Sequence, residues 1–75
     1  MIDREVQNRW ILGEDVPGVK FRMQQIVRVR SGVHRGIVGE LISLSAINPE
    51  PVFDLETDDG GDIFVGQSEI EPKAD

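Results

Sequence analysis

The sequence of 75 residues contains no cysteine, no tyrosine and a single histidine, His34. Without a thiol there is no disulfide to staple the fold, and no thiolate nucleophile or thiolate metal ligand. His34 stands next to Arg35 in a predicted loop, and a lone histidine there is expected to face solvent. Paired carboxylates occur only at predicted strand and turn positions that imply no enclosing pocket. We therefore predict that the chain is not an enzyme and has no metal, cofactor or small-molecule substrate.

Long hydrophobic runs are also missing. No apolar stretch approaches the ~20 residues that a membrane-spanning helix needs. The first eight residues, MIDREVQN, carry acids and lack the apolar core of a secretion signal. Together with the absence of cysteine, these features predict a cytoplasmic protein without membrane contact.

Aromatic residues number four, namely Trp10, Phe21, Phe53 and Phe64. Grooves for proline-rich ligands and cages for methylated lysine each need several exposed rings. A domain this small needs its aromatics inside, and we expect Phe53 and Phe64 in the core. Neither kind of aromatic site can then be assembled, and stacking of single-stranded bases is disfavoured as well.

The net charge of −6 is distributed unevenly along the chain. Residues 1–39 carry seven Lys/Arg and four acids, a net charge of +3, whereas residues 40–75 carry one lysine and ten acids, a net charge of −9. If the fold keeps these segments apart, the molecule is an electrostatic dipole. An acidic protein of pI near 4.6 repels nucleic-acid phosphates at long range, although a local basic stripe could still bind them.

The most informative stretch is IVRVRSGVHRGIVGELISL, residues 26–44. Alternation of valine and arginine at residues 27–30 predicts a half-buried strand over 25–30 with the arginines on its outer face. A loop with Gly32 and Gly36 follows, and a second strand is predicted over 36–44. Val38 and Leu41 are expected to be its core pair, with a β-bulge at Gly39 between them.

The second half of the chain continues the β pattern. A third strand is predicted over 52–57, with Phe53 and Leu55 on one face and Asp54 and Glu56 on the other. The sequence Asp-Asp-Gly-Gly at 58–61 is typical of a hairpin turn before a fourth strand over 62–65. A turn of 3₁₀ helix over 66–69 and a brief closing strand from Ile70 are expected to follow.

Residues 1–13 carry Ile2, Val6 and Trp10 at helical spacing, with acids near the start and Gly13 at the end. This pattern predicts a short N-terminal helix. The alternative is that residues 10–12 are extended and cover an open end of a barrel. In both cases Trp10 is expected to fill the core. A turn at 14–18, centred on Pro-Gly, follows.

The predicted fold is mainly β: a small five-stranded, SH3-like antiparallel barrel with a short N-terminal helix. Its predicted organisation is an N-terminal extension at 1–24, the barrel at 25–72 and a frayed tail at 73–75.

The motif VRVRSGVHRGIVGEL resembles the KOW motif of SH3-like barrels. The matching positions are Val27, Val29, Gly32, Arg35, Gly36, Val38, Gly39 and Leu41. The segment VFDLETDDGGDIFVGQSEIEP resembles the later strands of SH3-like and Tudor-like barrels, so the resemblance covers about residues 25–72. KOW modules often bind RNA or the transcription and translation machinery through the first loop. The resemblance implies that this role would pass to Arg28, Arg30, His34 and Arg35.

Two sets of charged residues are the candidate binding surfaces. The basic stripe consists of Arg28, Arg30, His34 and Arg35. The acidic face consists of Asp54, Glu56, Asp58, Asp59 and Asp62, with Glu69 and Glu71 nearby. The simplest alternative is that the arginines pair within the molecule with Asp54, Glu56 or Asp62.

Three functions follow from these surfaces. The first is a non-catalytic module that binds a protein through the first loop and the adjacent strand faces. The second is KOW-type association with RNA, the ribosome or a transcription complex through the basic stripe. The third is an acidic inhibitor of a basic protein, as some immunity proteins of bacterial toxins are, which would use the acidic face.

Overall fold

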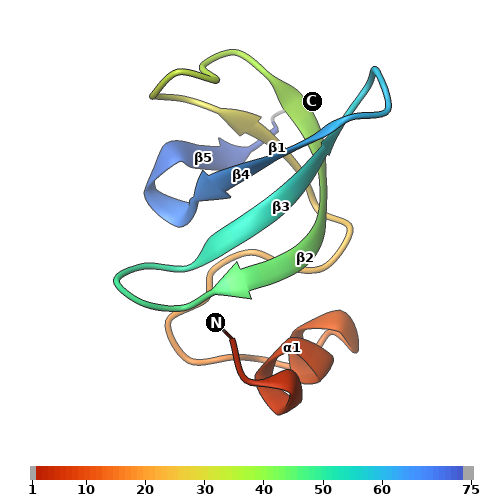
Figure 1. Ribbon diagram of the computed structural model, residues 1–75, viewed down its shortest axis with the longest axis vertical. Coiled ribbons are helices and arrows are strands. Elements are labelled where there is room, and N and C mark those ends of the chain that lie inside the picture. The colour runs from red at the N-terminus through yellow and green to blue at the C-terminus, as the bar shows by residue number, and fades with distance from the viewer. Residues whose placement is uncertain (1, 74–75) are drawn as a thin grey trace.

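A computed structural model describes residues 2–73. One α-helix precedes five strands and one 3₁₀ helix (Figure 1). The elements are α1 (Arg4–Ile11), β1 (Ile26–Val29), β2 (Val38–Ala46), β3 (Val52–Thr57), β4 (Asp62–Gly66), η1 (Gln67–Glu69) and β5 (Ile70–Pro72). The expected tail at 73–75 lies outside the described residues apart from Lys73.

The five strands form one antiparallel sheet in the order β4-β3-β2-β1-β5. The chain therefore makes three successive hairpins and then returns through η1, so that β5 pairs with β1. The prediction of a mainly β, five-stranded antiparallel fold with a short helix is confirmed. The β1–β2 loop and the β3–β4 hairpin project at the same end of the sheet, and α1 lies at the opposite end (Figure 1).

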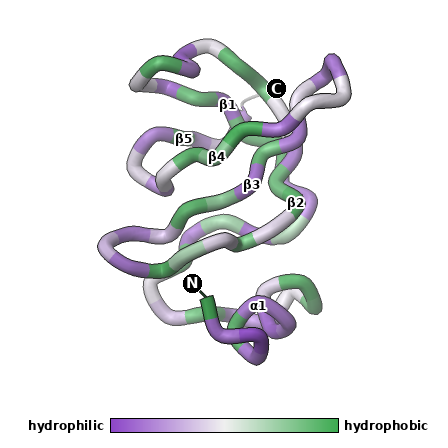
Figure 2. The backbone as a smooth tube through the Cα atoms, in the orientation of Figure 1, coloured by the Kyte–Doolittle hydropathy of each residue, from purple (hydrophilic) through white to green (hydrophobic). Residues whose placement is uncertain are grey.

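Strand β3 follows the alternation that the sequence predicts, because Phe53 and Leu55 are fully buried while Asp54 and Glu56 face outward. Hydrophobic and hydrophilic segments also alternate along the other strands, and the tip of the β3–β4 hairpin is hydrophilic (Figure 2). The predicted hairpin turn, the 3₁₀ helix and the closing strand are all present.

The predicted core role of Phe64 is wrong. Its neighbours Ile63 and Val65 occupy the inward positions of β4, with Val65 2% exposed. Because successive side chains of a strand point to opposite faces, Phe64 must then point outward. It is 61% exposed and lies opposite Asp54 in the sheet register.

Strand β2 differs from its prediction in two ways. Gly39 pairs regularly with Val27 and Thr57, and the irregularities of register fall instead between Leu41 and Ser43 and between Leu44 and Ala46. No bulge is therefore present at Gly39. Its backbone faces the core together with Leu41, whereas Val38 is only half-buried, so Val38 and Leu41 are not a core pair.

The helix prediction is confirmed, and the alternative of an extended segment at 10–12 is excluded. Asp3 caps α1 by accepting a hydrogen bond from the Glu5 backbone N–H (2.9 Å), which satisfies one of the free donors of the first turn. The Gln7 side chain donates to the Leu44 carbonyl (2.7 Å) and accepts from the Leu44 N–H (3.0 Å). A glutamine amide thus takes the place of a neighbouring strand on β2 and fixes the helix to the sheet.

Trp10 belongs to the core, as predicted. It is 2% exposed, and its indole N–H donates to the Phe21 carbonyl (2.8 Å). Its ring lies 5.7 Å from that of Phe53, and Phe21 packs edge-on against the other side at 6.0 Å. The division between an extension and a barrel at residue 24 stays a prediction, but the extension supplies part of the same core. Within residues 2–73, no helix is long and apolar enough to cross a bilayer.

Gly39 is required by a close approach of two strands. A Cβ at this position would lie far inside van der Waals contact with the Glu56 carbonyl oxygen and 3.1 Å from the Leu55 side chain. Since the first obstacle is backbone, the strands must separate to admit a methyl group. We expect Gly39→Ala to lower the free energy of unfolding by about 2 kcal/mol, measured by urea denaturation.

The matched control is Gly61→Ala. Gly61 has no left-handed φ, and an added Cβ would lie 3.3 Å from an Asp59 side-chain oxygen, with no backbone atom near it. We expect this variant to stay within about 0.5 kcal/mol of the parent. Equal losses in the two variants would contradict the proposed strand approach.

Candidate binding surfaces

The β1–β2 loop is a closed projection. At its base, the Val29 N–H donates to the Ile37 carbonyl and the Gly36 N–H donates to the Val29 carbonyl, both at 2.8 Å. Gly32 and Gly36 have φ of +88° and +95°, which glycine adopts without steric cost. Between these glycines Val33 and Arg35 are exposed, and His34 is half-buried.

The basic stripe is partly assembled by this geometry. Arg28 and Arg30 share the outward side at β1 and are exposed. Arg30 is held in place because its Nε donates to the Ser68 carbonyl of η1 (3.1 Å). Arg35 is exposed in the loop, whereas His34 is half-buried, so the expectation that His34 faces solvent is only partly met.

The alternative that the arginines pair with Asp54, Glu56 or Asp62 is excluded within residues 2–73. The ion pairs of this part of the chain are Arg9 with Glu5 (3.1 Å) and Arg22 with Asp15 (2.8 Å). The strand order gives the reason, because β2 separates β1 from β3. Arg28 instead lies opposite Val38 on one side and Glu71 on the other.

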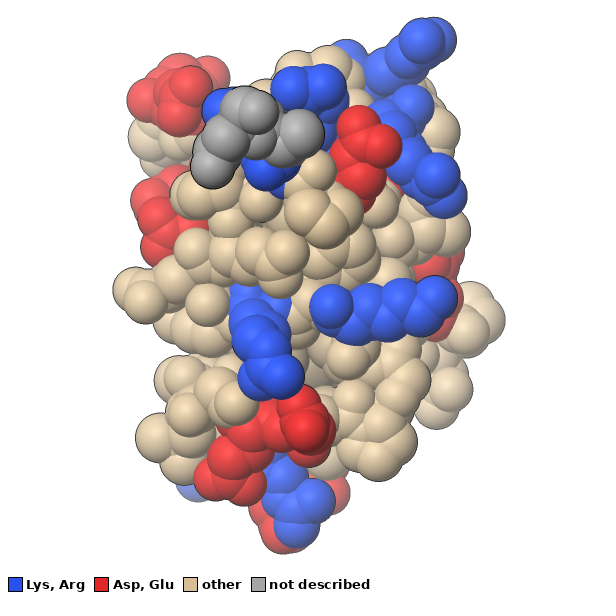
Figure 3. Space-filling model, turned by 180° about the vertical axis from the view of Figure 1, so that it is seen from behind, with Lys and Arg blue, Asp and Glu red and all other residues tan. Residues whose placement is uncertain are grey.

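Lys and Arg side chains gather over the upper part of the back of the molecule, towards the edge on which the β1–β2 loop projects (Figure 3). Acidic side chains lie at the margins and the lower end of this view, and an acidic group also lies among the basic ones in its upper part (Figure 3). The loop therefore presents positive charge in spite of the negative net charge.

Val33 is the residue that sequence reasoning missed on this surface. It is 95% exposed, the highest value among the large hydrophobic residues of the described chain. Its position between Gly32 and His34, outside any alternating run, is the signal that could have identified it. A single exposed apolar side chain is common on protein surfaces. What distinguishes Val33 is its place two residues before the exposed Arg35, in a loop that projects from the sheet.

The acidic face lies on the outer side of β3 and β4. Asp54 and Glu56 project from β3, and Asp62 projects from β4 opposite Glu56. Glu40 of β2 lies opposite Glu56 on the other side. Carboxylates thus stand directly across from one another on neighbouring strands, an arrangement that destabilises a sheet.

Asp58 and Asp59 extend this face to the hairpin tip, but their roles differ. The Asp59 carboxylate accepts hydrogen bonds from the Thr57 hydroxyl and the Gly61 N–H, and these bonds hold its pKa below the usual range. Asp59 therefore stabilises the turn. Asp58 is exposed and has no such bond among the described residues.

Two hollows flank the hairpin. The larger measures about 440 Å³, and its apolar part is formed by Ile37, Val38 and Ile63. Asp58, Asp59 and Asp62 also line it and supply carboxylates. Because Ile37 and Val38 follow the β1–β2 loop, this hollow lies directly beside the base of the basic loop.

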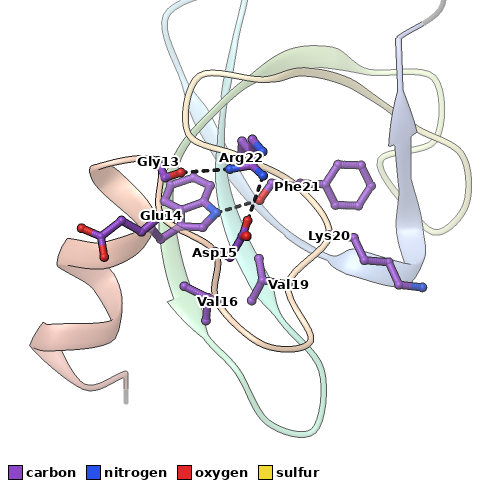
Figure 4. A pocket seen from close by; sticks show the side chains of 9 residues that line it. Gly13, Glu14, Asp15, Val16, Val19, Lys20, Phe21 and Arg22 are labelled. Atoms are coloured by element: carbon purple, nitrogen blue, oxygen red, sulfur yellow. Dashed lines mark hydrogen bonds and ion pairs between the residues drawn. The ribbon is translucent and has the colours of Figure 1, made fainter.

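A third hollow lies between α1 and the segment that follows it (Figure 4). Arg22 crosses it, donating to the Gly13 carbonyl (2.9 Å) and to Asp15 (2.8 Å). Its volume of about 50 Å³ suits one or two water molecules, so it is a packing gap and not a ligand site. Among residues 2–73, no three His, Cys, Asp or Glu side chains are placed to hold a metal ion.

Comparisons with protein-family models, with curated proteins and with solved structures gave no match. The fold and the two charged surfaces must therefore be interpreted from their own chemistry.

Asp54 is the most perturbed titratable group. Burial raises its pKa to about 6, and a hydrogen bond to Asp62 and the charges of Asp62 and Glu56 act in the same direction. Its Oδ1 is buried without a hydrogen-bond partner. Between the unfolded pKa of 3.8 and about 6, the folded state holds a proton that the unfolded state has released. Stability from this group is therefore present at low pH and is lost as the pH rises through about 6.

We expect Asp54→Asn to remove this part of the pH dependence and to raise stability at neutral pH. The free energy of unfolding is measured by urea denaturation at a series of pH values, both between the two pKa values of Asp54 and above them. Asp58→Asn, at the exposed turn, is the matched control and should keep the parent profile. A profile for Asp54→Asn that runs parallel to the parent would contradict the assignment.

Proposed function

We propose that the chain is a non-catalytic binding module with an SH3-like barrel architecture, and that it binds a protein through the β1–β2 loop and the adjacent strand faces. The order β4-β3-β2-β1-β5 with a 3₁₀ turn before the last strand supports this architecture, and so does the KOW-like motif across β1 and β2.

The observation that carries the proposal is the exposure of Val33 beside the exposed Arg35, in a loop whose arginine forms no ion pair within residues 2–73. Burying an apolar side chain is favourable in a protein interface, where Val33 would contact an apolar patch. Arg35 would meet carboxylates at the rim, where charge sets specificity and association rate. A phosphate backbone would use the arginines but would leave the valine without a partner.

A capture experiment tests the protein partner. The immobilised chain is exposed to a lysate of its own cells, and the retained components are compared with those of Val33→Ser/Arg35→Glu. We expect at least one component to be retained by the parent and lost by this variant, because both its apolar and its charged contacts are removed.

The matched control is Leu12→Ser/Arg4→Glu, which makes the same chemical changes near α1. Leu12 is 73% exposed and Arg4 is also exposed, so neither change should disturb the core. Retention by this control shows that the loss is specific to the loop. If parent and loop variant retain the same components, the proposal is wrong.

The second candidate is KOW-type binding to RNA, and the unpaired arginines favour it. If it is right, affinity for a short RNA should fall steeply with salt, because each phosphate contact releases counterions. We would expect Arg28→Glu/Arg35→Glu to weaken binding and to reduce the salt slope by roughly two. If the chain does not bind the RNA at low salt, or if its affinity for the RNA does not change with salt, the proposed binding of phosphates by the basic stripe is wrong. The acidic-inhibitor interpretation remains a prediction from the sequence.

A further inference from the structure

The β1–β2 loop and the β3–β4 hairpin carry opposite charge at the same end of the sheet. They diverge from each other at that end (Figure 1). Within residues 2–73 no ion pair joins them, since both ion pairs there belong to the N-terminal segment. The charges of the two projections are therefore not paired with each other within the molecule.

Both projections also have an apolar component. The loop presents Val33, which is 95% exposed. The hollow of about 440 Å³ beside the hairpin is lined by Ile37, Val38 and Ile63 together with the acidic residues of the hairpin. An apolar side chain near a cation on one surface thus matches, in chemistry, a hollow lined by apolar side chains and carboxylates on the other.

We propose that the protein partner of the β1–β2 loop is a second copy of this chain, in a two-fold symmetric dimer. In such an isologous contact, residue i meets residue j and j meets i. The loop of each copy would lie over the acidic hollow of the other, because loop and hollow are neighbours at one end of the molecule. This inference rests on the proposed function, since it gives the same loop a specific partner.

Charge complementarity is what favours a second copy. Arg35 would face Asp58 and Asp62 of the other copy, and Val33 would enter the hollow. The contact is small beside the ~800 Å² per partner of a standard interface. The net charge of −6 on each copy also opposes association at long range. We therefore expect a weak dimer that is in exchange with monomer.

The test is a charge swap measured by sedimentation velocity over a series of concentrations. Arg35→Glu and Asp58→Lys should each weaken self-association on the order of tenfold, because each replaces an attraction with a repulsion. An equimolar mixture of the two variants should restore dimerisation, since both contacts in the mixed dimer are again complementary. The double variant, which keeps the parent net charge, should also dimerise as the parent does.

Asp59 is left unchanged in this design because it stabilises the hairpin turn. Val33→Ser should weaken the dimer, and Leu12→Ser, at the opposite end, should not. Restoration by mixing cannot arise from misfolding of either variant, which keeps the result interpretable if one of them is less stable.

A parent chain that stays monomeric over the whole concentration range would overturn the inference. So would a mixture that associates no better than its components. The capture experiment separates these failures from failure of the proposed function. If the parent chain is monomeric and a different protein is retained in dependence on Val33 and Arg35, the loop stays a binding surface and the second copy is excluded as its partner.

Discussion

The hydrogen bond from the Trp10 indole to the Phe21 carbonyl closes the core, and the rest of the structure depends on it. A chain of 75 residues buries a modest share of its surface, so every large side chain matters. Trp10 and Phe21 cover two sides of Phe53, which is fully buried at the centre of the sheet. If the bond were absent, the indole N–H and the carbonyl would both be buried without partners, at about 1–3 kcal/mol for each group.

The two ends of the sheet differ in how they are covered. The end beside α1 is covered by the helix and by the Gln7 amide, which binds the Leu44 backbone. At the other end, the β1–β2 loop is closed by its own backbone hydrogen bonds and contributes no buried side chain between Arg30 and Gly36. Its residues are therefore free of core constraints. Val33 and Arg35 are exposed there and contribute nothing to the core, so both side chains are accessible to another molecule.

Local patterns predicted the strands well because each depends on near neighbours. The alternation in 52–57 and the Asp-Asp-Gly-Gly turn fix β3 and its hairpin by their own chemistry, and both agree with the structure. The requirement for glycine at position 39 could not be predicted from near neighbours. Its requirement comes from the Glu56 carbonyl of another strand, and a glycine near the start of a strand predicts a bulge equally well.

The predictions for Phe64 and for the partners of the arginines failed for a common reason, because both depend on how the strands are arranged in the sheet. Phe64 was expected in the core because small domains usually bury their aromatic residues. The alternation of Ile63 and Val65 in the same strand predicts the opposite, and the structure follows it. Pairing Arg28 with Asp54 assumed that their strands were neighbours, which only the strand order decides. The residues of both surfaces were identifiable from the sequence. Their grouping at one end of the sheet, and the exposure of Val33 there, required the fold.

The acidic face shows why net charge alone is a poor guide to what this chain binds. Glu40, Glu56 and Asp62 stand across adjacent strands without a cation between them, and Asp54 is driven towards its neutral form beside them. These carboxylates repel one another at a cost to the fold. No ion pair within residues 2–73 relieves this repulsion, because both ion pairs there belong to the N-terminal segment. At ionic strengths near 0.15 M, charges act over about 8 Å, so each surface is sensed separately by a partner. A basic loop on an acidic protein can therefore attract carboxylates, and the acidic hairpin can attract positively charged side chains, whatever the net charge of the molecule.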